Sequence, residues 1–139
     1  MNRREFLASA TAFSLIPLTA RAADPSAEPV PYTPGNAEAA MDAGQIVFLD
    51  FWASWCGTCA AQSRVLTELK AENPAYLEKI AFFVVDWDQY GTGELAQALT
   101  IPRRSTLVVL KGREELGRLV AGTGKAEIQA LLDTALAAS

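Results

Sequence analysis

The chain has two cysteines, Cys56 and Cys59, and only two residues separate them. Residues 46–51 before them are apolar except for one acid, which is typical of a strand buried on both faces. Residues 56–72, which begin with the first cysteine, repeat apolar side chains at helical spacing. A pair in the first turn of that helix has both sulfurs on one face, close enough to bond. This arrangement indicates thiol–disulfide chemistry.

The helix start gives the two thiols different roles. Cys56 lies where unpaired backbone N–H groups and the helix dipole favour negative charge, so we expect it to be the attacking nucleophile. Cys59 lies one turn further in and is expected to resolve the mixed disulfide that Cys56 forms. The alternative is an inert structural disulfide, which would close a very small loop and stabilise little.

Asp50 is the one ionisable residue in the strand at 46–51. Burial would raise its pKa and let the carboxylate accept the proton of Cys59 during resolution. The alternative is an aspartate at a wet strand end that has no role in the chemistry.

Composition and charge exclude several other classes of function. The chain has 139 residues, of which 50% are hydrophobic and 20% are charged, as in a single globular domain. Its net charge of −4 leaves no basic face for nucleic acid, so we expect no nucleic-acid partner. Two cysteines and no histidine are too few for a structural zinc site or a Cys/His catalytic pair. We therefore expect no metal and no cofactor.

The periodicity predicts an α/β fold with a mixed central sheet sandwiched between helices. The expected helices cover 36–43, 56–72, 94–99 and 125–137, and the expected strands cover 46–51, 80–85, 105–110 and 115–120, the last two as a hairpin. These elements form one domain over 36–139. Residues 23–35 contain four prolines and are expected to be a linker, with at most a short edge strand at 30–33.

Residues 1–22 are typical of an export signal. Arg3 and Arg4 precede an apolar run at 7–18, and Ala20-Arg21-Ala22 is a small-x-small cleavage site. We expect a twin-arginine signal peptide that is cleaved after Ala22 and delivers the protein to a bacterial periplasm. The alternatives are a retained membrane anchor, for which the run is short, and export by the general secretory route.

Residues 50–59 read Asp-Phe-Trp-Ala-Ser-Trp-Cys-Gly-Thr-Cys and resemble the active-site segment of thioredoxins, Asp-Phe-Trp-Ala-x-Trp-Cys-Gly-Pro-Cys. The similarity extends over nearly all of the chain after the signal and includes Gly122. It also resembles the C-terminal thioredoxin-like domain of the DsbD transmembrane reductase. The resemblance implies a thioredoxin-like fold, Asp50 as the proton acceptor, and Trp55 exposed near the substrate.

Two positions depart from the thioredoxin pattern. Thr58 replaces the proline between the cysteines, which restores an N–H group and is expected to change the reduction potential. Ser105 stands where the family has a cis-proline that faces the cysteines and pairs with the substrate. We expect the peptide before Ser105 to be trans or else strained for function. The resemblance places Trp55 and Ser105 at the substrate. Arg103 and Arg104, in the same loop as Ser105, are expected to stabilise the Cys56 thiolate or attract acidic substrates, unless they are solvated loop cations.

The direction of electron flow follows from what the motif lacks. Strong oxidants of the DsbA type carry histidine between their cysteines, and this chain has none. We therefore expect a monomeric protein-disulfide reductase that acts on protein or small-molecule disulfides and takes electrons from a membrane donor of the DsbD or CcdA type. The alternatives are a periplasmic disulfide oxidase and a non-catalytic binding or chaperone module.

Overall fold

The computed structural model describes residues 28–139. The predicted signal peptide and its cleavage site lie outside these residues. The described chain contains a five-stranded sheet in the order β1-β3-β2-β4-β5, as expected for a mixed α/β fold. β2 (Ile46–Trp52) is central, with β3 (Ala81–Asp86) parallel on one side and β4 (Thr106–Lys111) antiparallel on the other. The outer strands are β1 (Val30–Pro31), parallel to β3, and β5 (Glu114–Val120), antiparallel to β4.

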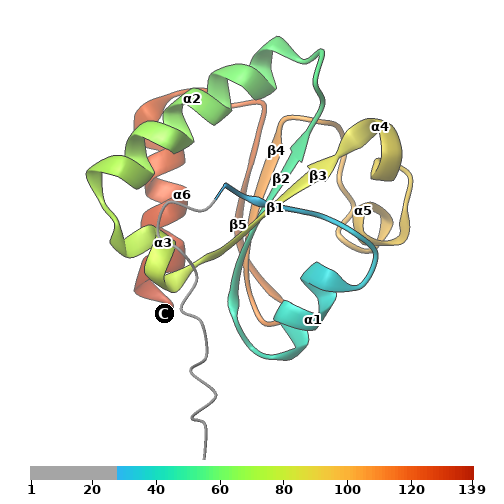
Figure 1. Cartoon of the computed structure of the whole chain (residues 1–139), viewed down its shortest axis with the longest axis horizontal. Coiled ribbons are helices and arrows are strands. Elements are labelled where there is room, and N and C mark those ends of the chain that lie inside the picture. The colour runs from blue at the N-terminus through green and yellow to red at the C-terminus, as the bar shows by residue number, and fades with distance from the viewer. Residues whose placement is uncertain (1–27) are drawn as a thin grey trace, which may run out of the picture.

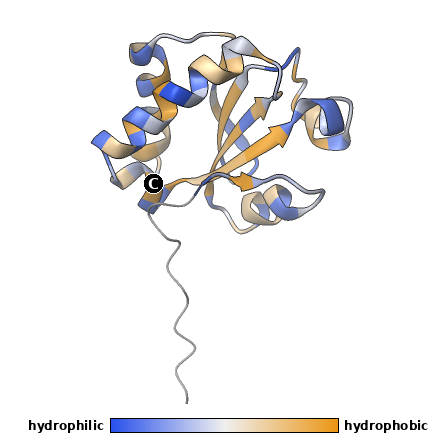
Figure 2. Ribbon diagram, turned by 45° about the horizontal axis from the view of Figure 1, so that its top comes forward, coloured by the Kyte–Doolittle hydropathy of each residue, from blue (hydrophilic) through white to orange (hydrophobic). Residues whose placement is uncertain are grey.

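Helices cover both faces of the sheet (Figure 1). α2 (Gly57–Glu72), α3 (Ala75–Lys79) and α6 (Lys125–Ala137) lie on one face. α1 (Asn36–Asp42), α4 (Trp87–Tyr90) and α5 (Glu94–Ala98) lie on the other. β2 is apolar except for Asp50, and successive side chains of a strand point to opposite faces, so both faces of β2 are mainly apolar. In Figure 2 the strands are mostly apolar, whereas the helices around them carry both apolar and polar residues.

The expected mixed sheet with helices on both faces is confirmed, with two additions. α3 and α4 were not predicted, because five and four residues are too few to show a helical period. Pro74 begins α3 as its N-cap, and the Asp86 carboxylate begins α4 by accepting a hydrogen bond from the N–H of Asp88. The sheet starts at Val30, within the segment for which we expected a linker with at most a short edge strand.

The buried face of α2 is rotated from the predicted one. We expected a stripe of Ala61, Val65 and Leu69 beside Leu66, whereas the buried residues of α2 are Cys59, Gln62, Leu66 and Leu69. The burial of Gln62 was not predicted, because the prediction counted only apolar residues as buried. Its amide can be buried because it finds backbone carbonyls to bond, as described below.

The central strand of the sheet leads into the cysteine segment. β2 runs directly into the loop before α2 (Figure 1), so the two cysteines stand at the carboxyl end of the central strand.

Gly44 ends α1 in a left-handed conformation, with φ of +75°, as expected for a glycine after a helix C-cap. Within residues 28–139, none of the helices has the length and apolar character needed to cross a bilayer.

Candidate redox site at the start of helix α2

Cys56 and Cys59 are joined by a disulfide, with their Cα atoms 5.2 Å apart. Cys56 is the N-cap of α2, and its Sγ accepts a hydrogen bond of 3.1 Å from the N–H of Cys59. The first turn of α2 carries no acidic residue that would oppose a negative sulfur. Cys56 retains 4% of its surface and Cys59 none, so Cys56 is the sulfur closer to solvent. This position favours a thiolate at Cys56 once the disulfide is reduced.

Ser105 lies against both sulfurs. Its Oγ is 3.1 Å from Cys56 Sγ and 3.1 Å from Cys59 Sγ, and the residue is fully buried. The peptide bond before Ser105 is trans, as expected, and Ser105 has a left-handed backbone with φ of +61°. Its N–H donates to Phe51 O at 2.7 Å, and its carbonyl accepts from the N–H of Ala121 at 2.8 Å. The backbone of β2 and of the segment after β5 therefore fixes this serine.

Gln62 is a residue of the site that the sequence analysis missed. Its Nε2 donates to Ser105 O at 3.0 Å and to Gly122 O at 2.9 Å. A Cβ atom on Gly122 would stand 2.6 Å from Leu119 Cδ1, so only glycine fits there without displacing a neighbour. Gln62 thus ties α2 to the segment before β4, which contacts the disulfide through Ser105, and to the segment after β5. Its position three residues after Cys59 on an otherwise apolar face was a signal that could have identified it.

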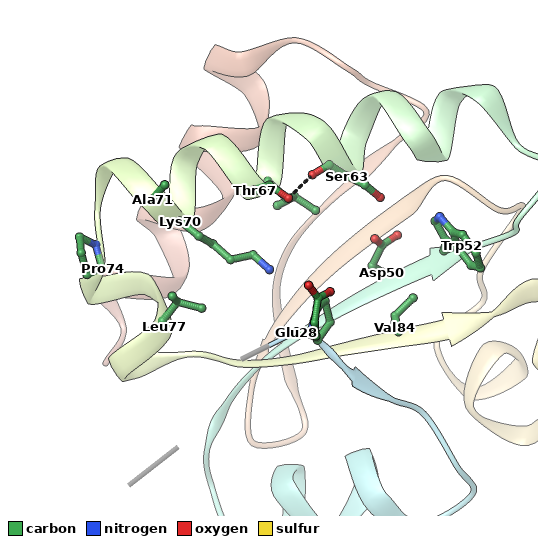
Figure 3. Close-up of a pocket in the computed structure, with 12 residues that line it drawn as sticks. Glu28, Asp50, Trp52, Ser63, Thr67, Lys70, Ala71, Pro74, Leu77 and Val84 are labelled. Atoms are coloured by element: carbon green, nitrogen blue, oxygen red, sulfur yellow. Dashed lines mark hydrogen bonds between the residues drawn. The ribbon is translucent and has the colours of Figure 1, made fainter. Parts of the chain in front are cut away.

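Asp50 faces α2 from the middle of β2 (Figure 3). The residue is 6% exposed, and its Oδ1 has no hydrogen-bond partner among the described residues. Burial raises the pKa of Asp50 from 3.8 to about 7, although the Lys70 ammonium on α2 acts in the opposite direction. The carboxyl therefore exchanges a proton near neutral pH, which a general base in this position requires.

A pocket of about 800 Å³ connects Asp50 with the surface between α2 and the sheet (Figure 3). Most of its lining is apolar, including Trp52, Leu66 and Leu77. Lys70 extends from α2 into this pocket, and burial lowers the pKa of its ammonium. The pocket gives the proton of Asp50 a route to solvent beneath α2.

Trp55, Arg104 and Asp88 form the outer rim of the site. Trp55 is 59% exposed, and its Nε1 donates to both carboxylate oxygens of Asp88, at 2.9 and 3.0 Å. The Arg104 guanidinium lies 4.4 Å from the centre of the Trp55 ring, as in a cation–π contact. Asp88 was not predicted for the site, because it lies in the short helix α4 after β3, which has no sequence period. The rim therefore presents an aromatic face and a cation beside Cys56.

The structure brings five of the six predicted site residues together at the carboxyl end of β2, and no hydrogen bond within residues 28–139 joins the sixth, Asp50, to either cysteine. Cys56, Cys59 and Ser105 are in direct contact, and Asp50 faces α2 from below. Within residues 28–139, no group of three or more cysteine, aspartate or glutamate side chains is placed to hold a metal ion. The arrangement can open and close one disulfide.

The chain is similar to known thioredoxins in both sequence and structure. The family model described as Thioredoxin matches residues 30–134. A thioredoxin of Mycolicibacterium smegmatis is 36% identical over 91 residues, which cover 65% of this chain and 78% of that protein. An H-type thioredoxin of Fagopyrum esculentum is 35% identical over 89 residues, which cover 64% and 71%. The crystal structure of Trxlp from Edwardsiella tarda superposes with a TM-score of 0.64 at 27% identity, covering 75% of this chain and 98% of that one.

The raised pKa of Asp50 predicts a pH-dependent stability. At pH values below about 3 the carboxyl is protonated in both folded and unfolded chains, so its burial does not lower the free energy of unfolding. As the pH rises to about 7 the unfolded chain ionises first, and the free energy of unfolding falls. Asp50→Asn cannot ionise, so it should raise the free energy of unfolding at pH 8 by roughly 2–4 kcal/mol.

Urea unfolding followed across this pH range measures the effect. The exposed Asp42→Asn is the control and should change the free energy of unfolding little at any pH. A gain from Asp50→Asn that is equal at pH 4 and pH 8 would contradict the assignment of a buried, titrating carboxyl.

Proposed function

This chain belongs to the thioredoxin family, and we propose that it is a periplasmic disulfide reductase acting on protein or small-molecule disulfides. Family membership and the Cys56–Cys59 pair make it a thiol–disulfide oxidoreductase. The observation that carries the proposal is the position of Cys56 as N-cap of α2, with a backbone N–H bonded to its sulfur. This position stabilises the thiolate that must attack a substrate disulfide.

The proposed reaction transfers two electrons to the substrate. The Cys56 thiolate attacks one sulfur of the substrate disulfide, forms a mixed disulfide and releases the other substrate sulfur as a thiolate. Asp50 accepts the proton of Cys59, whose thiolate then attacks Cys56 Sγ and releases the second substrate thiolate. The enzyme ends as the Cys56–Cys59 disulfide, and the substrate ends as two thiols after protonation by solvent.

The proposed direction rests on the residues between the cysteines. Gly57 and Thr58 carry no charge, and the chain has no histidine with which to stabilise a Cys56 thiolate as strongly as oxidants of the DsbA type do. Potentials of thioredoxin-like proteins span roughly −270 to −120 mV, and a less stabilised thiolate corresponds to the reducing end.

Substrate reduction requires both sulfurs in sequence, so single cysteine variants should fail at different steps. In a coupled assay with a dithiol reductant, the wild type should reduce insulin disulfides, and Cys56→Ala should show no turnover above background. In a separate reaction without the dithiol, pre-reduced Cys59→Ala should accumulate a mixed disulfide with the substrate, visible by mass spectrometry, because no second thiol resolves it. A wild type without turnover would favour a binding or chaperone module, and a potential near −120 mV would favour an oxidase.

We propose that Trp55, Arg104 and the Ser105 segment bind the substrate. The exposed Trp55 ring supplies an apolar surface, and Arg104 adds positive charge beside it. These features suit a disulfide flanked by apolar and acidic residues.

Arg104→Gln should therefore raise KM for an acidic disulfide peptide severalfold and leave kcat unchanged. A neutral peptide of the same length should be insensitive to the substitution, and added salt should weaken only the wild-type preference. Arg113→Gln is the matched control, because Arg113 pairs with Asp42 on the surface. An equal loss for both peptides would show that Arg104 does not select acidic substrates.

We propose that residues 1–22 export the protein and that a membrane dithiol donor of the DsbD or CcdA type keeps it reduced. The support is the twin arginine, the short apolar run and the small-x-small site in the sequence. A reductase in an oxidising compartment needs such a donor to remain active.

One mass measurement tests both parts. The protein is expressed from its full gene, and periplasmic extracts are alkylated before intact-mass analysis. The expected species begins at Ala23 and carries two alkyl groups in cells with the donor, and none in cells without it. A full-length mass in the membrane fraction would indicate a retained anchor, and an alkylation state independent of the donor would exclude that partner.

A further inference from the structure

We propose that Ser105 is a catalytic residue whose hydroxyl donates a hydrogen bond to whichever of the two sulfurs carries negative charge. The proposal rests on disulfide exchange at Cys56 and Cys59. It adds a group in direct contact with the reacting atoms that serves both the oxidation and the reduction of the pair.

The geometry allows one hydroxyl to serve two sulfurs. Ser105 Oγ is 3.1 Å from each of them, within hydrogen-bond distance for sulfur. A hydroxyl has one hydrogen, so it donates to one sulfur at a time, and rotation about the Cβ–Oγ bond redirects it. The residue is fully buried, so no water competes for this donor in the closed site.

The backbone holds the hydroxyl in place. Ser105 has φ of +61°, a conformation that residues other than glycine adopt rarely and that persists only where the surroundings fix it. Here the bonds to Phe51 O, Ala121 N–H and Gln62 Nε2 fix it from three separate segments. These are backbone bonds of Ser105, so its side chain is free for the sulfurs.

In the substrate half-reaction the hydroxyl supports the nucleophile. The reduced enzyme carries a Cys56 thiolate, to which Ser105 Oγ–H donates while the Cys59 thiol remains protonated. The thiolate attacks a substrate sulfur, a Cys56–substrate disulfide forms, and the substrate disulfide breaks. When Cys59 loses its proton, the hydroxyl turns to the Cys59 thiolate until that sulfur attacks Cys56.

In the return half-reaction the hydroxyl supports the leaving group. A thiolate of a dithiol donor attacks Cys56 Sγ, the Cys56–Cys59 bond breaks, and Cys59 leaves with the electron pair. Ser105 Oγ–H donates to this Cys59 thiolate as it forms. The second donor thiol passes its proton to the Cys59 thiolate and attacks the donor sulfur of the mixed disulfide, which releases the Cys56 thiolate. The donor is thereby oxidised to a disulfide and the enzyme pair is reduced.

The two sulfurs depend on Ser105 unequally. Cys56 Sγ also accepts a hydrogen bond from the N–H of Cys59. Within the described residues, Ser105 Oγ is the only hydrogen-bond partner of Cys59 Sγ. Loss of the hydroxyl should therefore destabilise a thiolate at Cys59 more than one at Cys56.

Thiol pKa values in single-cysteine proteins test this inference. Ser105→Gly removes the hydroxyl at a backbone conformation that glycine accepts, and Ser105→Ala is the second variant. With Cys56→Ala in the background, Ser105→Gly should raise the pKa of Cys59 by about 1 unit or more. With Cys59→Ala, it should raise the pKa of Cys56 by less. The pKa values are measured from the pH dependence of iodoacetamide alkylation.

The intact pair gives a second readout. Ser105→Gly should shift the equilibrium with glutathione toward the disulfide by less than tenfold, a potential more negative by less than about 30 mV, because the reduced enzyme carries its charge on Cys56. Ser105→Thr keeps the hydroxyl and should restore the wild-type value. The matched control is Thr106→Val, which removes the adjacent buried hydroxyl bonded to Arg103 O and should leave both thiol pKa values unchanged.

Two outcomes would overturn the inference. If Ser105→Gly and Ser105→Ala lower the stability but leave both thiol pKa values unchanged, the serine only packs against the disulfide. If only the pKa of Cys56 responds, the hydroxyl assists the nucleophile alone. None of these readouts needs a substrate, so an absence of insulin turnover in the wild type would contradict the proposed function without deciding this question.

Discussion

The chemistry of this protein depends on the position of one sulfur at the free N–H groups that begin α2. β2 fixes that position, because it is buried in the centre of the sheet and leads into α2 through a short loop. The hydrogen bond from the Cys59 N–H to Cys56 Sγ makes the cysteine itself the cap of the helix. The fold therefore activates the thiol with backbone groups that any helix must leave unpaired.

The buried polar residues gather at this same end of the sheet. Within residues 28–139 they are Asp50, Gln62, Ser105 and Thr106. Polar groups are expensive to bury, and Asp50 Oδ1 and Gln62 Oε1 lack hydrogen-bond partners there. The apolar clusters elsewhere stabilise the chain, so the structure tolerates this cost where an exchangeable proton and fixed donors are needed.

The amount that the sequence predicts differs between local and long-range features. The strand at 46–51, the helix after it and the cysteine pair follow from local periodicity and spacing, and the structure contains all three. The contacts of Ser105 with both sulfurs do not follow from periodicity, because they join residues more than forty positions apart. Gln62 was passed over because an apolar-stripe rule treats a glutamine as an outward residue. Asp88 reaches Trp55 through a short helix that has no sequence period.

The outer edge of the sheet has a consequence for association with other chains. β1 pairs with β3 at only two positions, and one of them is Pro31, which has no N–H to offer a further strand. Pro29, the residue before β1, lacks an N–H as well. An extended polypeptide that exposes its own strands finds little here to pair with. The β1 edge of the sheet is thus a poor template for pairing with another extended chain.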